Sequence, residues 1–365
     1  MTYTIEKVTT LIGARRYGDS EGNIGFLLTD SRSLCFPEET LFFALQSERN
    51  DGHNYIPELY RRGVRNFVVS RVPKGYASDY PGANFLKVVS TLEALQRLAE
   101  RHRDEFDIPI VGITGSNGKT MVKEWLYQLL SPGQRVTRSP RSYNSQIGVP
   151  LSVWLLNEQT QLGIFEAGIS QPGEMLALRD IMQPTIAVLT NLGAAHQENF
   201  PSMEAKCKEK LTLFHDAEVM VYRKDNELVS RMVDEGRYAG EKLCWSTQER
   251  EAPFYVEAIE KEGDTTHVSY IYKGVAGEYT LPFIDDASVA NSITCAVVAR
   301  RLGLSAEDLN ARMRSLEPVA MRLEVKEGQH GCTLINDSYN SDINSLDIAL
   351  DFMNRRPDHQ GRRRT

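Results

Sequence analysis

Short apolar runs alternate with amphipathic stretches over the middle of the chain, and this alternation predicts the order of its strands and helices. Segments with helical spacing, such as residues 91–103 and 121–130, separate the runs. Strands that alternate with helices favour a largely parallel, doubly wound sheet. Ligands gather at the carboxyl ends of the strands in such a sheet, so the residues that follow the runs are candidates for a site. The runs are Ile108–Thr114, Leu162–Ala167, Thr185–Thr190 and Glu218–Tyr222.

The patterns on either side differ from this alternation and divide the chain into three regions. Residues 1–86 mix short extended runs with a helix-like stretch, which suits a small α/β domain ending near the Pro81-Gly82 turn. Residues 87–316 hold the strand and helix alternation. Residues 317–365 hold two strand-like runs and one helix-like segment, which is too little for a self-contained domain. We therefore expect an α/β protein of three domains, cut inside the last one or completed elsewhere.

Three alternating stretches interrupt the second region before its final helices. They span Phe254–Ile259, Thr266–Tyr272 and Glu278–Phe283. Strict alternation of apolar and polar residues is typical of a strand with one buried face. We therefore predict a small antiparallel sheet here, apart from the parallel one.

Composition and charge exclude several classes of protein. The chain has 365 residues, enough for two or three domains, and a formal net charge of -7, which argues against nonspecific nucleic-acid binding. Its start has no basic segment before an apolar core, and no apolar run is long enough to span a bilayer. We expect a cytoplasmic protein without a nucleic-acid or membrane partner. The five cysteines are widely spaced, which indicates reduced packing residues, not a disulfide framework or a zinc site.

A glycine loop with a lysine follows the first buried run of the second region, and a helix-like stretch follows the loop. Glycines let backbone N–H groups reach phosphate oxygens, the lysine adds positive charge, and a threonine hydroxyl can ligate magnesium. The loop predicts that the chain binds ATP or GTP. The usual loop has another glycine where this chain has Ile113, so the shorter Thr-Gly-x-x-Gly-Lys-Thr pattern indicates a particular subset of nucleotide-binding proteins. The loop residues are Thr114, Gly115, Ser116, Asn117, Gly118, Lys119 and Thr120.

Three further patterns lie near strand ends or helix starts. Glu166 ends a buried run, and a carboxylate beside a triphosphate is a common magnesium ligand. His196 follows the next strand end, although a lone histidine is more often structural. Asn144 begins a polar loop that enters a helix, which by itself is only a turn.

Together with the glycine loop, these patterns resemble the Mur ligase family, whose members use ATP to form amide bonds in the peptidoglycan stem peptide. The resemblance covers nearly the whole chain. Residues 29–56 are similar to the family's uridine-side domain, which implies Ser31 and Arg32 as substrate contacts. The patterns around Asn144 and residues 191–200 are most similar to the member that adds D-alanyl-D-alanine to UDP-N-acetylmuramoyl tripeptide. Asn144 then becomes a third candidate for substrate binding.

The resemblance implies two magnesium sites and a sequence of chemical steps. ATP would phosphorylate the terminal carboxylate of the UDP-linked peptide, and an incoming amine would attack the acyl phosphate. Thr120 and Glu166 would hold the first magnesium ion and His196 would help to hold a second. Lys119 and the loop amides would bind the β and γ phosphates, so that Lys119, Glu166 and His196 are expected catalytic residues.

The family also modifies a lysine with carbon dioxide, and the resulting carbamate is an anionic oxygen ligand for the second magnesium. Lys206, Lys208 and Lys210 follow His196 in one helix-like stretch. Lys210 matches the family spacing, because Leu213-Phe214 follows it and His196 precedes it by fourteen residues. An unmodified ammonium would repel magnesium, whereas a carbamate would bind it. The alternative is the solvated face of a charged helix.

The remaining expected contacts rest on the resemblance alone. Asn291 would lie near the adenine, although the family's other two polar positions are missing there. In the last region, Arg322 would reach the phosphates, Asp337 the ribose and Asn340 the acceptor side. Asn336 stands where the family usually has aspartate.

The resulting hypothesis is a ligase that uses ATP, two magnesium ions and a lysine carbamate, with UDP-N-acetylmuramoyl peptide and D-alanyl-D-alanine as partners. Three alternatives stay open: the preceding ligase, which adds the third stem residue; a phosphotransferase or NTP-hydrolysing switch; and a noncatalytic sensor of UDP-peptide. In some bacteria this ligase is fused to an alanine racemase, so a longer native chain is one expectation for the short last region.

Overall fold

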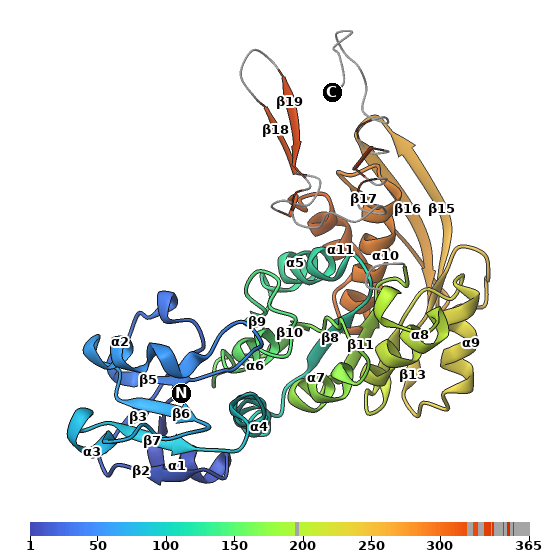
Figure 1. Ribbon diagram of the computed structural model, residues 1–365. Helices are drawn as coiled ribbons and strands as arrows, with labels where there is room; N and C mark the ends of the chain where they lie inside the picture. Colours follow the sequence, from blue (N-terminus) through green and yellow to red (C-terminus); the bar gives the residue numbers. More distant parts are fainter. Residues whose placement is uncertain are drawn as a thin grey trace.

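The structure is a computed structural model in which two bodies are joined by a helix (Figure 1). A small domain at one end contains the N-terminus. The larger part holds the parallel central sheet, a separate and mainly antiparallel sheet, and a hairpin. The helix between them is α4 (Thr91–Arg103). The structure describes residues 1–193, 197–319, 324–327, 332–336, 338, 346, 349–350 and 353.

The first domain is built on a five-stranded sheet in the order β2-β7-β6-β5-β4. Strands β4 to β7 are mutually parallel, and β2 runs antiparallel to β7. The Pro81-Gly82 turn precedes β7, so the sheet continues past the point where the turn signal placed its end. The strands are β2 (Arg15–Tyr17), β4 (Phe26–Leu28), β5 (Thr40–Phe43), β6 (Asn66–Val69) and β7 (Asn84–Lys87).

Helices cover both faces of this sheet. One buried apolar cluster joins the sheet to α1 (Ile5–Leu11) and α4, and the other joins it to α2 (Ile56–Arg61). The short pair β1 (Tyr3–Thr4) and β3 (Asn23–Ile24) and the helix α3 (Tyr76–Asp79) complete the domain.

The central sheet has six strands, all parallel, in the order β13-β12-β11-β8-β10-β9. The predicted parallel, doubly wound sheet is thus confirmed. Its strands are β8 (Ile110–Thr114), β9 (Val136–Arg138), β10 (Leu162–Glu166), β11 (Ile186–Leu189), β12 (Val219–Val221) and β13 (Glu241–Lys242).

Alternate residues of each central strand point to opposite layers of helices. Val111 and Ile113 pack in one cluster with α5 (Lys119–Leu130) and α10 (Asp286–Arg301), while Ile110 packs in the other. The strands therefore read as nearly continuous apolar runs. The second layer contains α6 (Gly148–Val153), α7 (Glu174–Met182), α8 (Met203–Leu211) and α9 (Glu227–Glu235).

The second antiparallel sheet has a strand that the sequence pattern did not reveal. Strands β15 (Phe254–Glu262), β16 (Thr265–Tyr272) and β17 (Val275–Leu281) are antiparallel as predicted. The fourth strand, β14 (Trp245–Ser246), pairs parallel with β15 and is too short to show a period. This sheet packs on α10 and α11 (Ala306–Met313).

The last region contains an antiparallel hairpin of β18 (Glu324–Glu327) and β19 (Thr333–Asn336), which projects from the body in Figure 1. These strands match the two strand-like runs predicted there, at 322–326 and 332–335. The helix-like segment predicted in the same region, at 343–353, lies largely outside the described residues. Cys207, Cys244 and Cys295 are buried, but Cys35 and Cys332 are exposed, so the packing role predicted for all cysteines is wrong for those two. No helix in the described ranges has the length and apolar character needed to cross a membrane.

A buried aromatic cluster joins the first domain to the central part. His102 of α4 accepts a hydrogen bond at Nδ1 from the Tyr3 hydroxyl (2.8 Å), and its Nε2 lies 3.0 Å from the Leu156 carbonyl. Trp154 packs against both rings and donates from Nε1 to the Gly25 carbonyl (2.9 Å). Burial lowers the pKa of His102 from its usual 6.5 to about 4, so the ring is neutral in the fold at pH 7.

This cluster predicts a pH-dependent loss of stability. An unfolded histidine binds a proton below pH 6.5, whereas folded His102 does so only near pH 4, so acid favours the unfolded chain. The contribution lost by pH 5 is about 2 kcal/mol. Urea unfolding of the wild type and of His102→Gln at pH 7.5 and 5.0 checks this, since glutamine does not titrate. An equal pH dependence in both proteins would contradict it.

Candidate functional site

The glycine loop connects β8 to α5 with a backbone that only glycine can adopt at two positions. Gly115 has φ of 149° and Gly118 has φ of 82°, both in the region that favours glycine. A Cβ on Gly115 would lie 1.9 Å from Thr190 Oγ1, and one on Gly118 would lie 2.5 Å from Asn291 Oδ1. The loop backbone is therefore packed closely against neighbouring polar side chains.

The end of β11 supports this loop. Asn191 accepts hydrogen bonds from the N–H of Ser116 at its carbonyl (3.0 Å) and from the N–H of Asn117 at its Oδ1 (2.8 Å). The Thr190 hydroxyl donates to the Asn117 carbonyl (2.5 Å), and the Ser116 hydroxyl bonds to Gly193. A bound phosphate would replace the two bonds to Asn191 or use the amides at the start of α5. The sequence had pointed to residues 191–200, but not to a supporting role for Asn191.

Lys119 and Lys210 both reach the same carbonyl of the loop. Lys119 Nζ donates to the Gly115 carbonyl (2.9 Å), and Lys210 Nζ donates to it from α8 (3.1 Å). Lys210 is only 3% exposed, and burial, followed by the charges of Lys119 and Lys206, holds its pKa well below the usual value. The structure thus brings these two predicted residues together on one side of the loop.

The lysine-rich helix has an inner and an outer face. Lys206 is 1% exposed and donates to the Gly193 carbonyl (2.5 Å), whereas Lys208 is exposed. Burial lowers the pKa of Lys206 as well. The alternative of a solvated helix face is therefore wrong for Lys206 and Lys210, which lie one helical turn apart, and right for Lys208 alone.

Glu166 lies beside the loop because β10 and β8 are parallel neighbours, with Glu166 paired to Ile113. Its side chain is fully buried, and its Oε2 accepts hydrogen bonds from Thr120 Oγ1 (3.0 Å) and Asn144 Nδ2 (3.4 Å). Three predicted residues from three elements therefore meet at one carboxylate. A hydroxyl and a carboxylate at a phosphate loop form a hard-oxygen donor set that fits magnesium.

Lys123 belongs to this site and was missed by the sequence reading. It lies one turn of α5 after Lys119, its Nζ is 3.1 Å from Glu166 Oε1, and both side chains are 0% exposed. The available signal was a lysine within the helix-like stretch 121–130, but the sequence did not show that this lysine is buried.

The other predicted nucleotide contacts are only partly within the described residues. Asn291 lies at the glycine loop and not in a separate site. It packs against Gly118, and its Nδ2 is 3.2 Å from Met121 Sδ. His196, Arg322, Asp337 and Asn340 lie outside the described residues.

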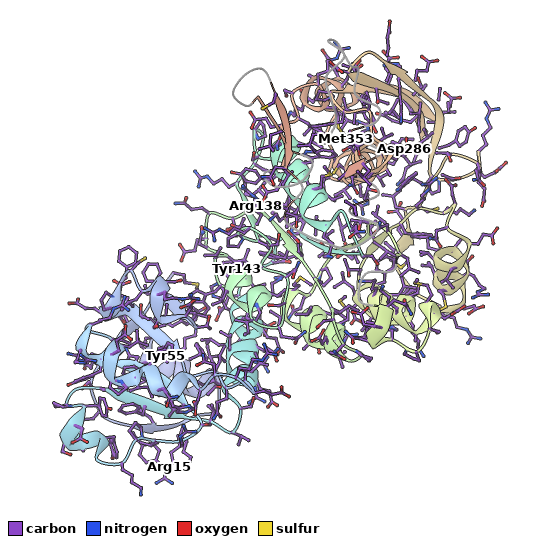
Figure 2. All side chains as sticks on the ribbon, turned by 45° about the horizontal axis from the view of Figure 1, so that its top comes forward. Arg15, Tyr55, Arg138, Tyr143, Asp286 and Met353 are labelled. Atoms are coloured by element: carbon purple, nitrogen blue, oxygen red, sulfur yellow. The ribbon has the colours of Figure 1, made fainter. Side chains whose placement is uncertain are left out.

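A second candidate site is a cavity of about 540 Å³ in the first domain. Arg32 pairs there with Asp30 (2.6 Å), and this guanidinium lowers the pKa of the Asp30 carboxyl to about 2. Ile147, at the start of α6, belongs to the lining, so the cavity opens at the junction with the central part. In Figure 2, Tyr143 lies on the side of the central part nearest this domain. The other lining residues are Thr29, Ser31, Leu45, Gln46, Ser47, Asn50, Gly52 and Tyr55.

A phosphate loop at the carboxyl edge of a doubly wound sheet defines a nucleotide-binding α/β protein. Residues 113–299 match the family model of the Mur ligase middle domain. The chain belongs to the Mur ligase family.

Among related proteins, the UDP-N-acetylmuramoyl-tripeptide--D-alanyl-D-alanine ligase of Bacillus subtilis is 28% identical over 88% of this chain and 68% of that protein. The enzyme of the same name from Synechocystis sp. is 31% identical over 93% of this chain and 71% of that protein. Among solved structures, MurF from Thermotoga maritima in complex with ADP has a TM-score of 0.77 at 25% identity and covers 91% of this chain and 75% of that one. MurF from Acinetobacter baumannii shares the fold, with a TM-score of 0.87 at 22% identity over 98% of this chain and 77% of that one.

The tight packing of the loop glycines predicts a selective loss of nucleotide binding. Gly118→Ala places a methyl group against Asn291 and strains the backbone, so ADP affinity measured by calorimetry should fall by at least about tenfold. The matched control is Gly133→Ala, where the nearest atom would be 3.9 Å away. Equal ADP affinities of the two variants would contradict the expected phosphate contact.

Proposed function

We propose that this chain joins D-alanyl-D-alanine to UDP-N-acetylmuramoyl-tripeptide with the hydrolysis of ATP to ADP and phosphate, in the synthesis of peptidoglycan precursors. The observation that carries the proposal is the meeting of Thr120, Glu166 and Asn144 beside the glycine loop. The names of the related ligases supply the substrates. Because ATP is consumed, we place the reaction in the cytoplasm.

The reaction divides into phosphoryl transfer and amide formation. A carboxylate oxygen of the tripeptide attacks the γ phosphorus and ADP leaves, which gives an acyl phosphate. The amine of D-alanyl-D-alanine then attacks the acyl carbon, loses a proton, and phosphate leaves from the tetrahedral intermediate. Positioning and charge neutralisation are the main tasks of a protein in such chemistry. The chain offers the loop and Lys119 for the phosphates.

Magnesium, when bound, would neutralise charge on the transferred phosphoryl group. Thr120 and Glu166 would hold the first ion, since the Thr120 hydroxyl and Glu166 Oε2 lie 3.0 Å apart beside the loop. The other oxygen, Glu166 Oε1, is buried and pairs with Lys123 Nζ (3.1 Å), which leaves Oε2 as the oxygen on the side of Thr120. His196 and a modified Lys210 would hold the second ion.

The low pKa of Lys210 supports its modification by carbon dioxide. A neutral amine is the form that attacks carbon dioxide, with loss of a proton, to give a carbamate. Burial, followed by the charges of Lys119 and Lys206, lowers the pKa of Lys210 and so shifts it toward the neutral amine. The carbamate would in turn bring an anionic group beside Lys119 and Lys206, whose charges both lower the pKa of Lys210.

Each domain would bind one part of the reaction mixture. We assign residues 1–86 to the UDP substrate, residues 87–316 to ATP and residues 317–365 to the start of the ligase domain. Ser31 and Arg32 line the cavity of the first domain, and Asn144 donates a hydrogen bond to Glu166. Asn291 would lie near the adenine, and Arg322, Asp337 and Asn340 stay predictions for phosphate, ribose and acceptor contacts.

Substrate preference tests the proposed function. Calorimetric titration should show tighter binding of UDP-N-acetylmuramoyl tripeptide than of the dipeptide form, and phosphate release should require both tripeptide and D-alanyl-D-alanine. Preference for the dipeptide would indicate the preceding ligase. Phosphate release without an acceptor would indicate an NTP-hydrolysing switch.

The carbamate predicts a defined response of Lys210 variants. Lys210→Ala should lower ligation by about 100-fold or more, since the second magnesium would lose its anionic ligand. Wild-type enzyme freed of carbon dioxide should regain activity with bicarbonate, and Lys210→Ala should not. The matched control is Lys208→Ala on the exposed face of the same helix. Full activity of Lys210→Ala would contradict the proposed modification.

A further inference from the structure

Lys123 is a fully buried lysine whose polar contacts are two carboxylates, one of them Glu166, and two backbone carbonyls. Its Nζ is 3.1 Å from Glu166 Oε1, 2.9 Å from Glu124 Oε1 and 2.9 Å from the Ser139 carbonyl, and it also donates to the Arg141 carbonyl. Burial of an ammonium group is unfavourable unless it is paired and hydrogen-bonded. These contacts satisfy it and join α5 to β10 and to the loop after β9.

The two oxygens of Glu166 have different surroundings because of Lys123. Oε1 faces the ammonium group, while Oε2 faces the hydroxyl of Thr120 (3.0 Å) and the amide of Asn144 (3.4 Å). A carboxylate held in this way presents one oxygen to an ion beside Thr120. Magnesium requires near-octahedral geometry, so the orientation of a single ligand oxygen affects its binding.

The loop after β9 is held by the same lysine. Arg141 has φ of 49°, an uncommon conformation for a residue with a side chain, and its carbonyl accepts a hydrogen bond from Lys123. The next residue, Ser142, lies 3.0 Å from Thr120 through its hydroxyl. Glu124 extends the contacts to Arg138, whose Nε is 3.0 Å from Glu124 Oε2. Arg138, the last residue of β9, and Tyr143 in this loop are labelled in Figure 2.

We propose that Lys123 is a positioning residue that fixes Glu166 Oε2 and the loop 139–144 in the geometry that accepts magnesium with the nucleotide. The identity of the ion rests on the proposed function. Lys123 acts through Glu166 and the loop and does not itself touch the nucleotide. Its loss should weaken the contribution of magnesium to nucleotide binding more than nucleotide binding itself.

The test compares ADP binding with and without magnesium by calorimetry. In Lys123→Met, ADP affinity in EDTA should stay within about threefold of the wild-type value. The magnesium gain, defined as ADP affinity with magnesium divided by ADP affinity in EDTA, should be lower than in the wild type by about tenfold or more. Lys74→Met, which removes an exposed lysine of the first domain, should keep the wild-type gain. In ligation assays the KM for magnesium should rise more than kcat falls.

A second variant guards against misfolding, because Lys123→Met leaves Glu166 without its cation. Lys123→Gln keeps an N–H donor for the Ser139 carbonyl but has no charge, and the same loss of the magnesium effect is expected. A full magnesium gain in either folded variant overturns the inference. Loss of ADP binding in EDTA by both variants would show a general structural role and would also overturn it.

The same measurements separate this inference from the proposed function. A wild-type chain that binds ADP with magnesium in a Lys123-dependent way, but does not ligate tripeptide to D-alanyl-D-alanine, would support the inference and overturn the proposed function alone.

Discussion

The buried carboxylate of Glu166 is the group on which the arrangement of the site depends. A carboxylate removed from water is stable only with charged or hydrogen-bonded partners around it. Here Lys123 lies on one oxygen, and Thr120 and Asn144 lie on the other. Each partner comes from α5 or from the loop before α6. The contacts that stabilise this one buried charge therefore also fix the position of the glycine loop relative to the loop 139–144.

The parallel sheet makes this arrangement geometrically possible. Strands β10, β8 and β11 are neighbours that end at the same edge, so Glu166, Thr114 and Thr190 lie side by side although they are far apart in sequence. Thr190 and Asn191, which directly follow β11, then support the glycine loop. The phosphate loop is thus shaped by a neighbouring strand as much as by its own glycines.

The central sheet and part of the site could be predicted from the sequence, because the spacing of apolar residues and the residues of turns are local properties of the chain. The apolar runs predicted the parallel strands, and the rule that ligands gather at strand ends singled out Glu166 before its surroundings were known. Lys123 could not be assigned in this way, since its partners Ser139 and Arg141 lie across a loop whose path depends on tertiary packing. Helical spacing places Lys206 and Lys210 on a common face, but only the packing of α8 shows that this face is buried.

The aromatic cluster at Tyr3, His102 and Trp154 shows that a functional unit and a cooperative folding unit need not coincide. Leu95 and Leu98 of α4, together with Trp154, complete the apolar cluster of the first sheet. Residues 1–86 excised alone would keep α1 on this face of their sheet but would expose the apolar side chains that α4 and Trp154 cover. The sheet of the first domain, which also carries the candidate cavity, is therefore packed in part by side chains from outside residues 1–86.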